Sequence, residues 1–116
     1  MRAMPIPDVS EIDLAGVMHA FADPSRLAII AALAHMPEQS CDDLGGLAGL
    51  VQMAKSTRSH HMRVLREAGV TAARYEGTRK IVWLRRADLD ARFPGLLDAV
   101  LAGVDADAAE GSVELV

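Results

Sequence analysis

The residues best suited to chemistry in this chain lie in segment 55–70, which combines hydroxyl, imidazole and guanidinium side chains with apolar ones. Residues three and four apart are neighbours on a helix. One face of a helix here would therefore gather four polar side chains: Ser56, Ser59, His60 and Arg63. Ser hydroxyls can meet phosphates or base edges, an imidazole can donate or accept, and a guanidinium suits a phosphate or a guanine. The chemistry that this face predicts is contact with duplex DNA in the major groove.

The start of the same helix supplies a second set of donors. Lys55 and Thr57 fall in its first turn, where free backbone N–H groups can also donate to phosphates. We expect these two residues to position the DNA backbone rather than to read sequence. Met62 and Leu65 give the opposite face its apolar character, and we expect His61 to turn to that inner side as a structural histidine.

Arg58 does not fit this two-faced pattern, because it stands one turn before Met62 on the inner side. Either the helix is rotated slightly, or the Arg58 stem lies over the core while its guanidinium reaches a phosphate. We favour the second interpretation. The connection 49–54 before the helix is longer than a tight turn, which leaves the spacing to the preceding helix open.

A β-hairpin is predicted after the helix, because segments 70–75 and 80–84 flank a tetrapeptide that contains glycine. Arg79 and Lys80 would lie near its tip, and Arg74 on its first strand. Such a basic tip can follow the DNA backbone or enter a narrow minor groove. The alternative is an ordinary charged turn in solvent.

The net charge of −4 is unevenly distributed. Residues 52–86 hold nine Lys and Arg against two acids, a net charge of +7, whereas the remainder holds three against fourteen, a net charge of −11. Because salt screens charges beyond roughly 10 Å, phosphate attraction is local, and a basic middle can bind DNA despite an acidic total. The other interpretation is a solvated basic face.

The surrounding elements are predicted to be mainly helical. Apolar spacing and caps indicate a helix from Asp8 to Phe21, a second from Asp23 to His35, a short third over 40–50, and a break at Pro94 within an apolar stripe over 88–103. We expect one domain over residues 1–103 and an acidic, flexible tail over 104–116. The predicted fold class is mainly α, with five to six helices and a two-stranded antiparallel wing.

Three collinear motifs resemble the ArsR-type family of winged helix-turn-helix regulators. They are the runs Phe21-Ala22-Asp23-Pro24-Ser25-Arg26-Leu27, Lys55-Ser56-Thr57 with Ser59-His60-His61, and Val64-Leu65-Arg66-Glu67-Ala68-Gly69-Val70. The resemblance covers roughly residues 12–103. It implies a homodimeric repressor that binds an imperfect palindrome in a promoter and that, in many members, an effector releases.

A homodimer is also expected because a small module buries little surface on DNA and two-fold repetition doubles its contacts. Apolar stripes on the first and last helices exceed what so small a domain must bury on itself, and we expect them to pair across an isologous interface. The predicted interface residues are Ile12, Val17, Phe21, Phe93, Leu96, Leu97, Val100 and Leu101. The competing interpretation is that both stripes only fill the core of the protomer.

No cofactor and no metal site are predicted. Where members of the ArsR-type family bind a metal, the resemblance implies that its ligands would be a Cys-x-Cys pair on the third helix or Asp and His pairs on the last helix. This chain lacks both sets, because it has one cysteine and no histidine after His61. A non-standard site from His19, His35 and Cys41 with Asp42 stays an alternative, as does a protein-interaction module with an acidic partner. We expect no enzyme, because no catalytic constellation is recognisable, and a cytoplasmic protein without a membrane span.

Overall fold

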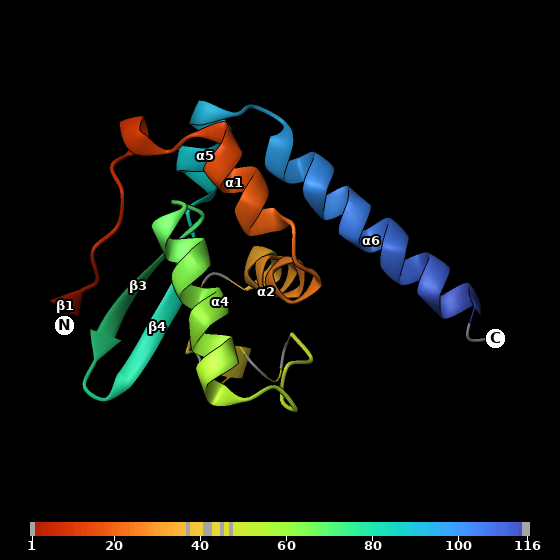
Figure 1. Cartoon of the computed structure of the whole chain (residues 1–116), viewed down its shortest axis with the longest axis horizontal. Helices are drawn as coiled ribbons and strands as arrows, with labels where there is room; N and C mark the ends of the chain where they lie inside the picture. Colours follow the sequence, from red (N-terminus) through yellow and green to blue (C-terminus); the bar gives the residue numbers. More distant parts are fainter. Residues whose placement is uncertain (1, 37, 41–42, 45, 47, 115–116) are drawn as a thin grey trace.

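The computed structural model describes residues 2–36, 38–40, 43–44, 46 and 48–114. Its elements follow the predicted order of helices and hairpin (Figure 1). The helical elements are η1 (Val9–Glu11), α1 (Leu14–Phe21), α2 (Pro24–His35), α4 (Lys55–Glu67), α5 (Arg86–Arg92) and α6 (Leu96–Glu114), and the strands are β1 (Arg2–Ala3), β2 (Gln39–Ser40), β3 (Thr71–Glu76) and β4 (Arg79–Leu84). Residues 43, 44 and 46 are also helical, within the segment predicted as the short third helix.

The predicted hairpin is β3 and β4, which we call the wing. A two-residue turn joins the strands, and Gly77 adopts φ +63° at its first central position, where glycine carries little penalty. The sheet is larger than the sequence predicted, because β1 pairs with β3 and β2 with β4, giving the antiparallel order β1-β3-β4-β2. Two-residue strands are too short to show a period-two pattern, so sequence periodicity could not reveal them.

The predicted helix from Asp8 to Phe21 is divided into η1 and α1. A capping box between Asp8 and Glu11 closes the short 3₁₀ turn. The carbonyl oxygen of Ile12 then accepts two hydrogen bonds from the Arg92 guanidinium, at 3.1 and 2.7 Å. These contacts from α5 hold Ile12 in extended backbone, so the helix restarts at Leu14.

The core is built from the apolar faces of α1, α2 and α4 with the strand residues Ala73 and Val82. Gly69 ends α4 with φ +87°, and a Cβ at this position would lie 2.5 Å from Cγ1 of Ile12. The helix therefore ends at Gly69 for two reasons, a left-handed backbone and a close approach to the η1–α1 junction.

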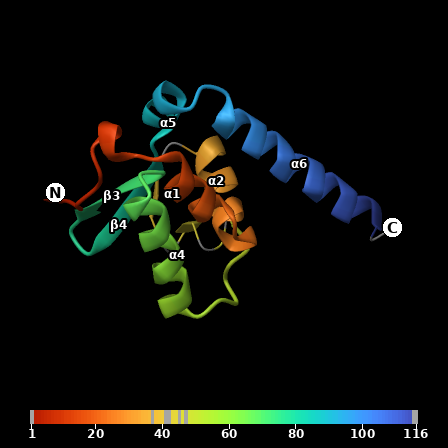
Figure 2. The same cartoon turned by 45° about the horizontal axis from the view of Figure 1, so that its top comes forward.

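The last helix differs most from its prediction. Gly95, with φ +84°, separates α5 from α6, as the break at Pro94 predicted. However, α6 continues to Glu114 through the segment predicted as a flexible tail, because alanine-rich segments have high helix propensity. It projects away from the rest of the molecule in both views (Figures 1 and 2).

Among the described residues, no single helix is long and apolar enough to cross a membrane. The pair α1 and α2 passes that test of length and composition together, but the two helices bend by 100° at their junction.

Candidate nucleic-acid interface

The outer face of α4 carries the side chains that the sequence placed there. Ser56, Ser59, His60 and Arg63 are all exposed to solvent. On the opposite face Met62 and Leu65 are buried in the core. Packing thus fixes the rotation of the helix about its axis, and the four polar groups point outward together.

Two contacts order this face. Arg63 approaches Glu67 at 3.8 Å between Nε and Oε1, an exposed i,i+4 pair, and its Nη2 lies 3.5 Å from Nδ1 of His60. Because exposed ion pairs contribute little and are screened by salt, a phosphate can replace Glu67 as the partner of Arg63.

The first turn of α4 is free of side-chain capping. Its N-cap residue is Ala54, which provides no side-chain hydrogen bond. The exposed residues Lys55, Ser56 and Thr57 follow it, so the helix begins with exposed N–H donors beside an ammonium and two hydroxyl groups. Oriented N–H groups and the helix dipole at such an end favour an anion. Arg58, next in the chain, is half-buried.

A buried network positions α4, and Arg26 is its centre. The Arg26 side chain donates from Nε to the Ala20 carbonyl oxygen at 2.8 Å and from Nη2 to that of His19 at 3.2 Å. Its Nη1 lies 3.1 Å from Nδ1 of His61. One guanidinium thus caps the end of α1 and holds α4 through its buried histidine.

His61 therefore has the structural role that the sequence predicted. A guanidinium has only donors, so Nδ1 of His61 must accept and the ring proton lies on Nε2. Nε2 is 4.0 Å from Oδ1 of Asp23. The sequence reasoning had no function for Arg26, although the Asp-x-x-Arg spacing that starts α2 was visible in the motif.

Asp23 serves as the N-cap of α2. Its Oδ1 accepts from the N–H groups of Ser25, at 2.8 Å, and Arg26, at 3.2 Å. Burial opposes ionisation, yet the backbone hydrogen bonds from Arg26 and Ser25, with the charge of Arg26, hold the pKa of Asp23 below its ordinary value. The carboxylate thus remains ionised at neutral pH where it faces α4.

On the wing, Lys80 lies directly opposite Tyr75 and shares a face with the core residue Val82. Arg79 is exposed near the turn and approaches Asp43 at 3.7 Å between Nη2 and Oδ2. That pair is exposed on both sides, so it is weak and exchangeable. Arg79 is therefore accessible to a phosphate at the predicted basic tip, whereas Lys80 is only partly exposed.

Arg74, which was predicted to contact DNA, forms ion pairs with two carboxylates in the structure. It donates to both carboxylate oxygens of Glu38, at 2.9 and 3.0 Å, and to Glu76, and its guanidinium lies 5.2 Å from the centre of the Trp83 ring. The hydrogen bonds to Glu38 and then Glu76 raise the pKa of Arg74 further above its ordinary value. Two carboxylates already neutralise this charge, so Arg74 stabilises the wing instead of adding to its positive potential.

The residues predicted for a dimer interface divide into two groups. Ile12, Val17, Phe21 and Leu97 are buried within the protomer and leave almost no surface for a partner. The remaining four are partly buried against the same core: Phe93, Leu96, Val100 and Leu101.

The sequence analysis missed two apolar side chains on α1, since Leu14 is 51% and Met18 48% exposed. Their i,i+4 spacing within the apolar start of α1 was the available signal.

The alternative metal site is not assembled in the described part of the chain. His19 and His35 are exposed at the ends of α1 and α2. Within the described residues, no three His, Cys, Asp or Glu side chains group closely enough to hold a metal ion. Cys41 and Asp42 lie outside the described residues.

With this geometry in view, comparison with known proteins identifies the family. The protein-family model described as "Bacterial regulatory protein, arsR family" matches residues 23–70 of this chain. YceK of Bacillus subtilis (strain 168), described as an uncharacterized HTH-type transcriptional regulator, is 39% identical over 87 residues, which cover 74% of this chain and 84% of that protein. The chain belongs to the ArsR family. It is a DNA-binding transcriptional regulator of this family and not an enzyme.

Solved structures agree with the fold of this ArsR-family chain. The solution structure of a homodimeric winged helix-turn-helix DNA-binding domain from Mycobacterium bovis is 28% identical, with a TM-score of 0.59, covering 84% of this chain and 80% of that one. The crystal structure of an ArsR family transcriptional regulator is 20% identical, with a TM-score of 0.60. The likeness covers 88% of this chain and 94% of that one. The second likeness concerns the fold alone. The predicted winged helix-turn-helix fold is confirmed.

Proposed function

We propose that this ArsR-family chain is a homodimeric repressor that binds a pseudo-palindromic promoter operator through α4 and the wing. The observation that carries this proposal is the exposed outer face of α4. Its four polar side chains point to solvent, while Met62 and Leu65 anchor the opposite face in the core. Side chains held in this way can reach base edges in a major groove without reorganisation of the helix.

The remaining predicted contacts divide by task in this proposal. Lys55 and Thr57 at the helix start bind phosphates and set the register, as do Arg58 and the wing residues Arg79 and Lys80. Ser56, Ser59, His60 and Arg63 face the bases. Phosphate contacts position a protein on DNA, whereas base contacts give it specificity.

Exposed apolar surface on α1 supports the homodimer. Leu14 and Met18 lie on one side of a helix whose other side is buried in the core. The protruding α6 carries the partly buried residues Val100 and Leu101 beyond its first turn. We assign the interface to these exposed and partly buried groups, with the fully buried predicted residues supporting it from within. The relative from Mycobacterium bovis is itself homodimeric.

The repressor acts, in this proposal, by occupying a promoter site until an effector or partner protein releases it. A two-fold dimer places two recognition helices about 34–36 Å apart, one turn of DNA. The operator should then contain two inverted half-sites whose centres are roughly 10 base pairs apart.

The experiment is a binding titration on the DNA upstream of the protein's own gene, followed by fluorescence anisotropy from 50 to 200 mM salt. We expect binding that weakens steeply with salt and survives a hundredfold excess of random duplex. If random duplex competes as well as the upstream duplex, the protein has no operator there and the proposal fails.

A further inference from the structure

The N-terminal strand brings an additional cation to the wing. Strand β1 pairs with β3 in the register Arg2–Tyr75 and Ala3–Arg74, and Met4 extends the pairing by donating its N–H to the Ala73 carbonyl oxygen at 3.0 Å. The Arg2 guanidinium lies 5.4 Å from the centre of the Tyr75 ring. A residue near the start of the chain is therefore held in place by backbone pairing and by a cation–π contact.

The segment that follows Arg2 is anchored as well. The Met4 sulfur lies 3.9 Å from Nη1 of Arg66 on α4, and the Pro7 carbonyl oxygen accepts from Nη1 of Arg85 at 2.8 Å. These contacts fix β1 at its C-terminal side, so Arg2 is positioned before any ligand binds.

Arg2 shares a face of the sheet with Lys80. Residues directly opposite each other on adjacent strands lie on the same face, so the pairs Arg2–Tyr75 and Tyr75–Lys80 place all three side chains in one row. We call Arg2, Tyr75 and Lys80 the basic row. Alternation along the strands puts it on the side of Ala73 and Val82, which is the side packed against the helices. The strand spacing separates the two cations by roughly 10 Å, enough for each to contact a different phosphate.

The opposite face of the wing differs in its charge balance. There Arg74 is neutralised by Glu38 and Glu76, and Arg79 approaches Asp43. In the described part of the chain, neither Arg2 nor Lys80 forms an ion pair. Among the described residues, the wing cations without a carboxylate partner therefore lie in the basic row, while Arg79 has a weak and exchangeable one.

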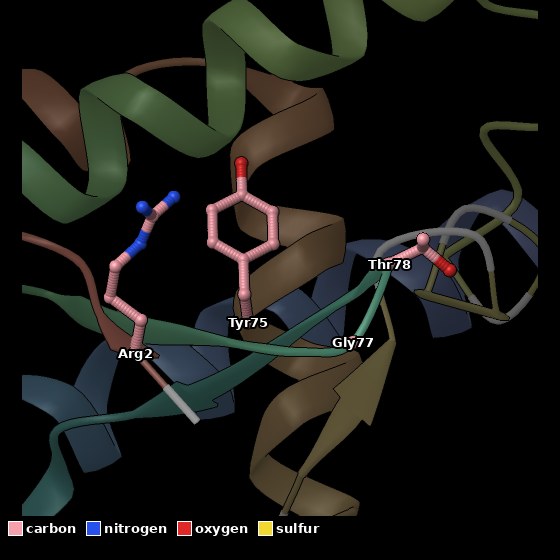
Figure 3. Close-up of a pocket in the computed structure, with 4 residues that line it drawn as sticks. All are labelled: Arg2, Tyr75, Gly77 and Thr78. Atoms are coloured by element: carbon pink, nitrogen blue, oxygen red, sulfur yellow. The ribbon is translucent and has the colours of Figure 1, made fainter.

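Arg2 also borders an open recess at the wing turn. Arg2 and Tyr75 line it together with Gly77 and Thr78. Figure 3 shows the guanidinium of Arg2 and the hydroxyl of Tyr75 pointing to the same side, toward α4. A guanidinium and a hydroxyl that converge at an open, solvent-exposed edge suit a phosphate rather than a buried organic ligand.

We propose that Arg2, held over Tyr75 by the β1–β3 pairing, contacts a backbone phosphate of bound DNA in this recess. The wing then presents three strands instead of two to the duplex, and the N-terminal strand adds affinity without adding sequence preference. This inference rests on the proposed DNA-binding function and extends its contact surface to a residue outside α4 and the hairpin.

The test uses the full chain, with any purification tag at its C-terminus, on the upstream duplex and on a random duplex. Three variants are compared: Arg2→Gln, Arg2→Lys, and Arg86→Gln on α5 as a control that removes the same charge. Since each lost phosphate contact reduces the slope of log affinity against log salt by about 1, Arg2→Gln should lower that slope by about 1 per protomer. The Arg2→Gln substitution should lower the affinity for both duplexes by the same factor. The salt slope should be unchanged in Arg2→Lys and in Arg86→Gln.

The outcomes distinguish this inference from the function on which it rests. If the wild-type chain binds the upstream duplex specifically and Arg2→Gln has an unchanged salt slope, the Arg2 contact is wrong and the proposed function stands. A lower melting temperature of Arg2→Gln with an unchanged slope assigns Arg2 a structural role only, which also overturns the inference. If the wild-type chain binds neither duplex, both proposals fail.

Discussion

At the scale of single residues, Arg26 connects the fold to the candidate interface. Its guanidinium satisfies two carbonyl groups at the end of α1 and one imidazole nitrogen on α4. His61 precedes the core residue Met62 and follows the exposed His60, so the orientation of this imidazole helps to set the outer face of the helix. The residue that positions the recognition surface is thus on α2, outside that surface.

Removing the Arg26 donors should destabilise the protein. Arg26→Met retains an apolar stem but leaves the carbonyl oxygens of His19 and Ala20 and Nδ1 of His61 unpaired. We expect the free energy of unfolding to fall by about 2–4 kcal/mol, measured by urea denaturation. Arg86→Met removes a more exposed guanidinium, which pairs with Asp98 at 3.0 Å, and should cost about 0–1 kcal/mol. Equal losses in the two variants would show that the Arg26 network does not stabilise the fold.

At the scale of elements, α1 has two faces with different tasks. Val17 and Phe21 are buried in the core, while Leu14 and Met18 remain exposed. The apolar spacing of α1 was visible in the sequence, but which of its apolar side chains face the core and which face solvent was not. That direction depends on α2, α4 and α5, and contacts such as the Arg92 hydrogen bonds to Ile12 connect residues 80 positions apart.

A charge on the exposed side of α1 should weaken self-association. In Met18→Asp a carboxylate would be buried in the proposed interface, and we expect the dimer dissociation constant to rise at least about tenfold, since roughly 1.4 kcal/mol corresponds to that factor. Val51→Asp is the matched control, because Val51 is 68% exposed outside the proposed interface. Sedimentation velocity over a concentration series measures the dimer dissociation constant of the wild-type chain and of both variants. A wild-type chain that stays monomeric, or equal effects of the two substitutions, would contradict the assigned interface.

The same scale shows what sequence patterns could and could not predict. The two faces of α4 and the two long strands of the wing follow from periods of 3.6 and 2, which a sequence displays directly. Strands β1 and β2 have two residues each and depend on pairing with distant segments. The neutralisation of Arg74 depends on Glu38, which β2 brings to the wing from 36 positions away. Charge counts along the chain therefore gave the net charge of the basic region but could not show which of its cations pair with carboxylates.

At the scale of the whole molecule, the elements that would touch DNA and those that would join two protomers lie apart. The start of α4 and the turn of the wing lie on the side opposite α5 and α6 (Figures 1 and 2). In a two-fold dimer formed through α1 and α6, this separation leaves both recognition helices accessible to one duplex. A signal that alters the dimer can then change the distance between the two helices, and hence the affinity for DNA.

The most direct test of the central claim, that the outer face of α4 reads bases, is selection of bound sequences from a random DNA library. We predict that the wild-type chain selects an inverted repeat. The Ser59→Ala/His60→Ala variant should lose preference at the positions those side chains read, at about 1–3 kcal/mol per base pair, while keeping its affinity for random DNA. His19→Ala, which removes an exposed histidine of α1, should select the wild-type sequence. Retention of the full wild-type preference by the Ser59→Ala/His60→Ala variant would contradict the account.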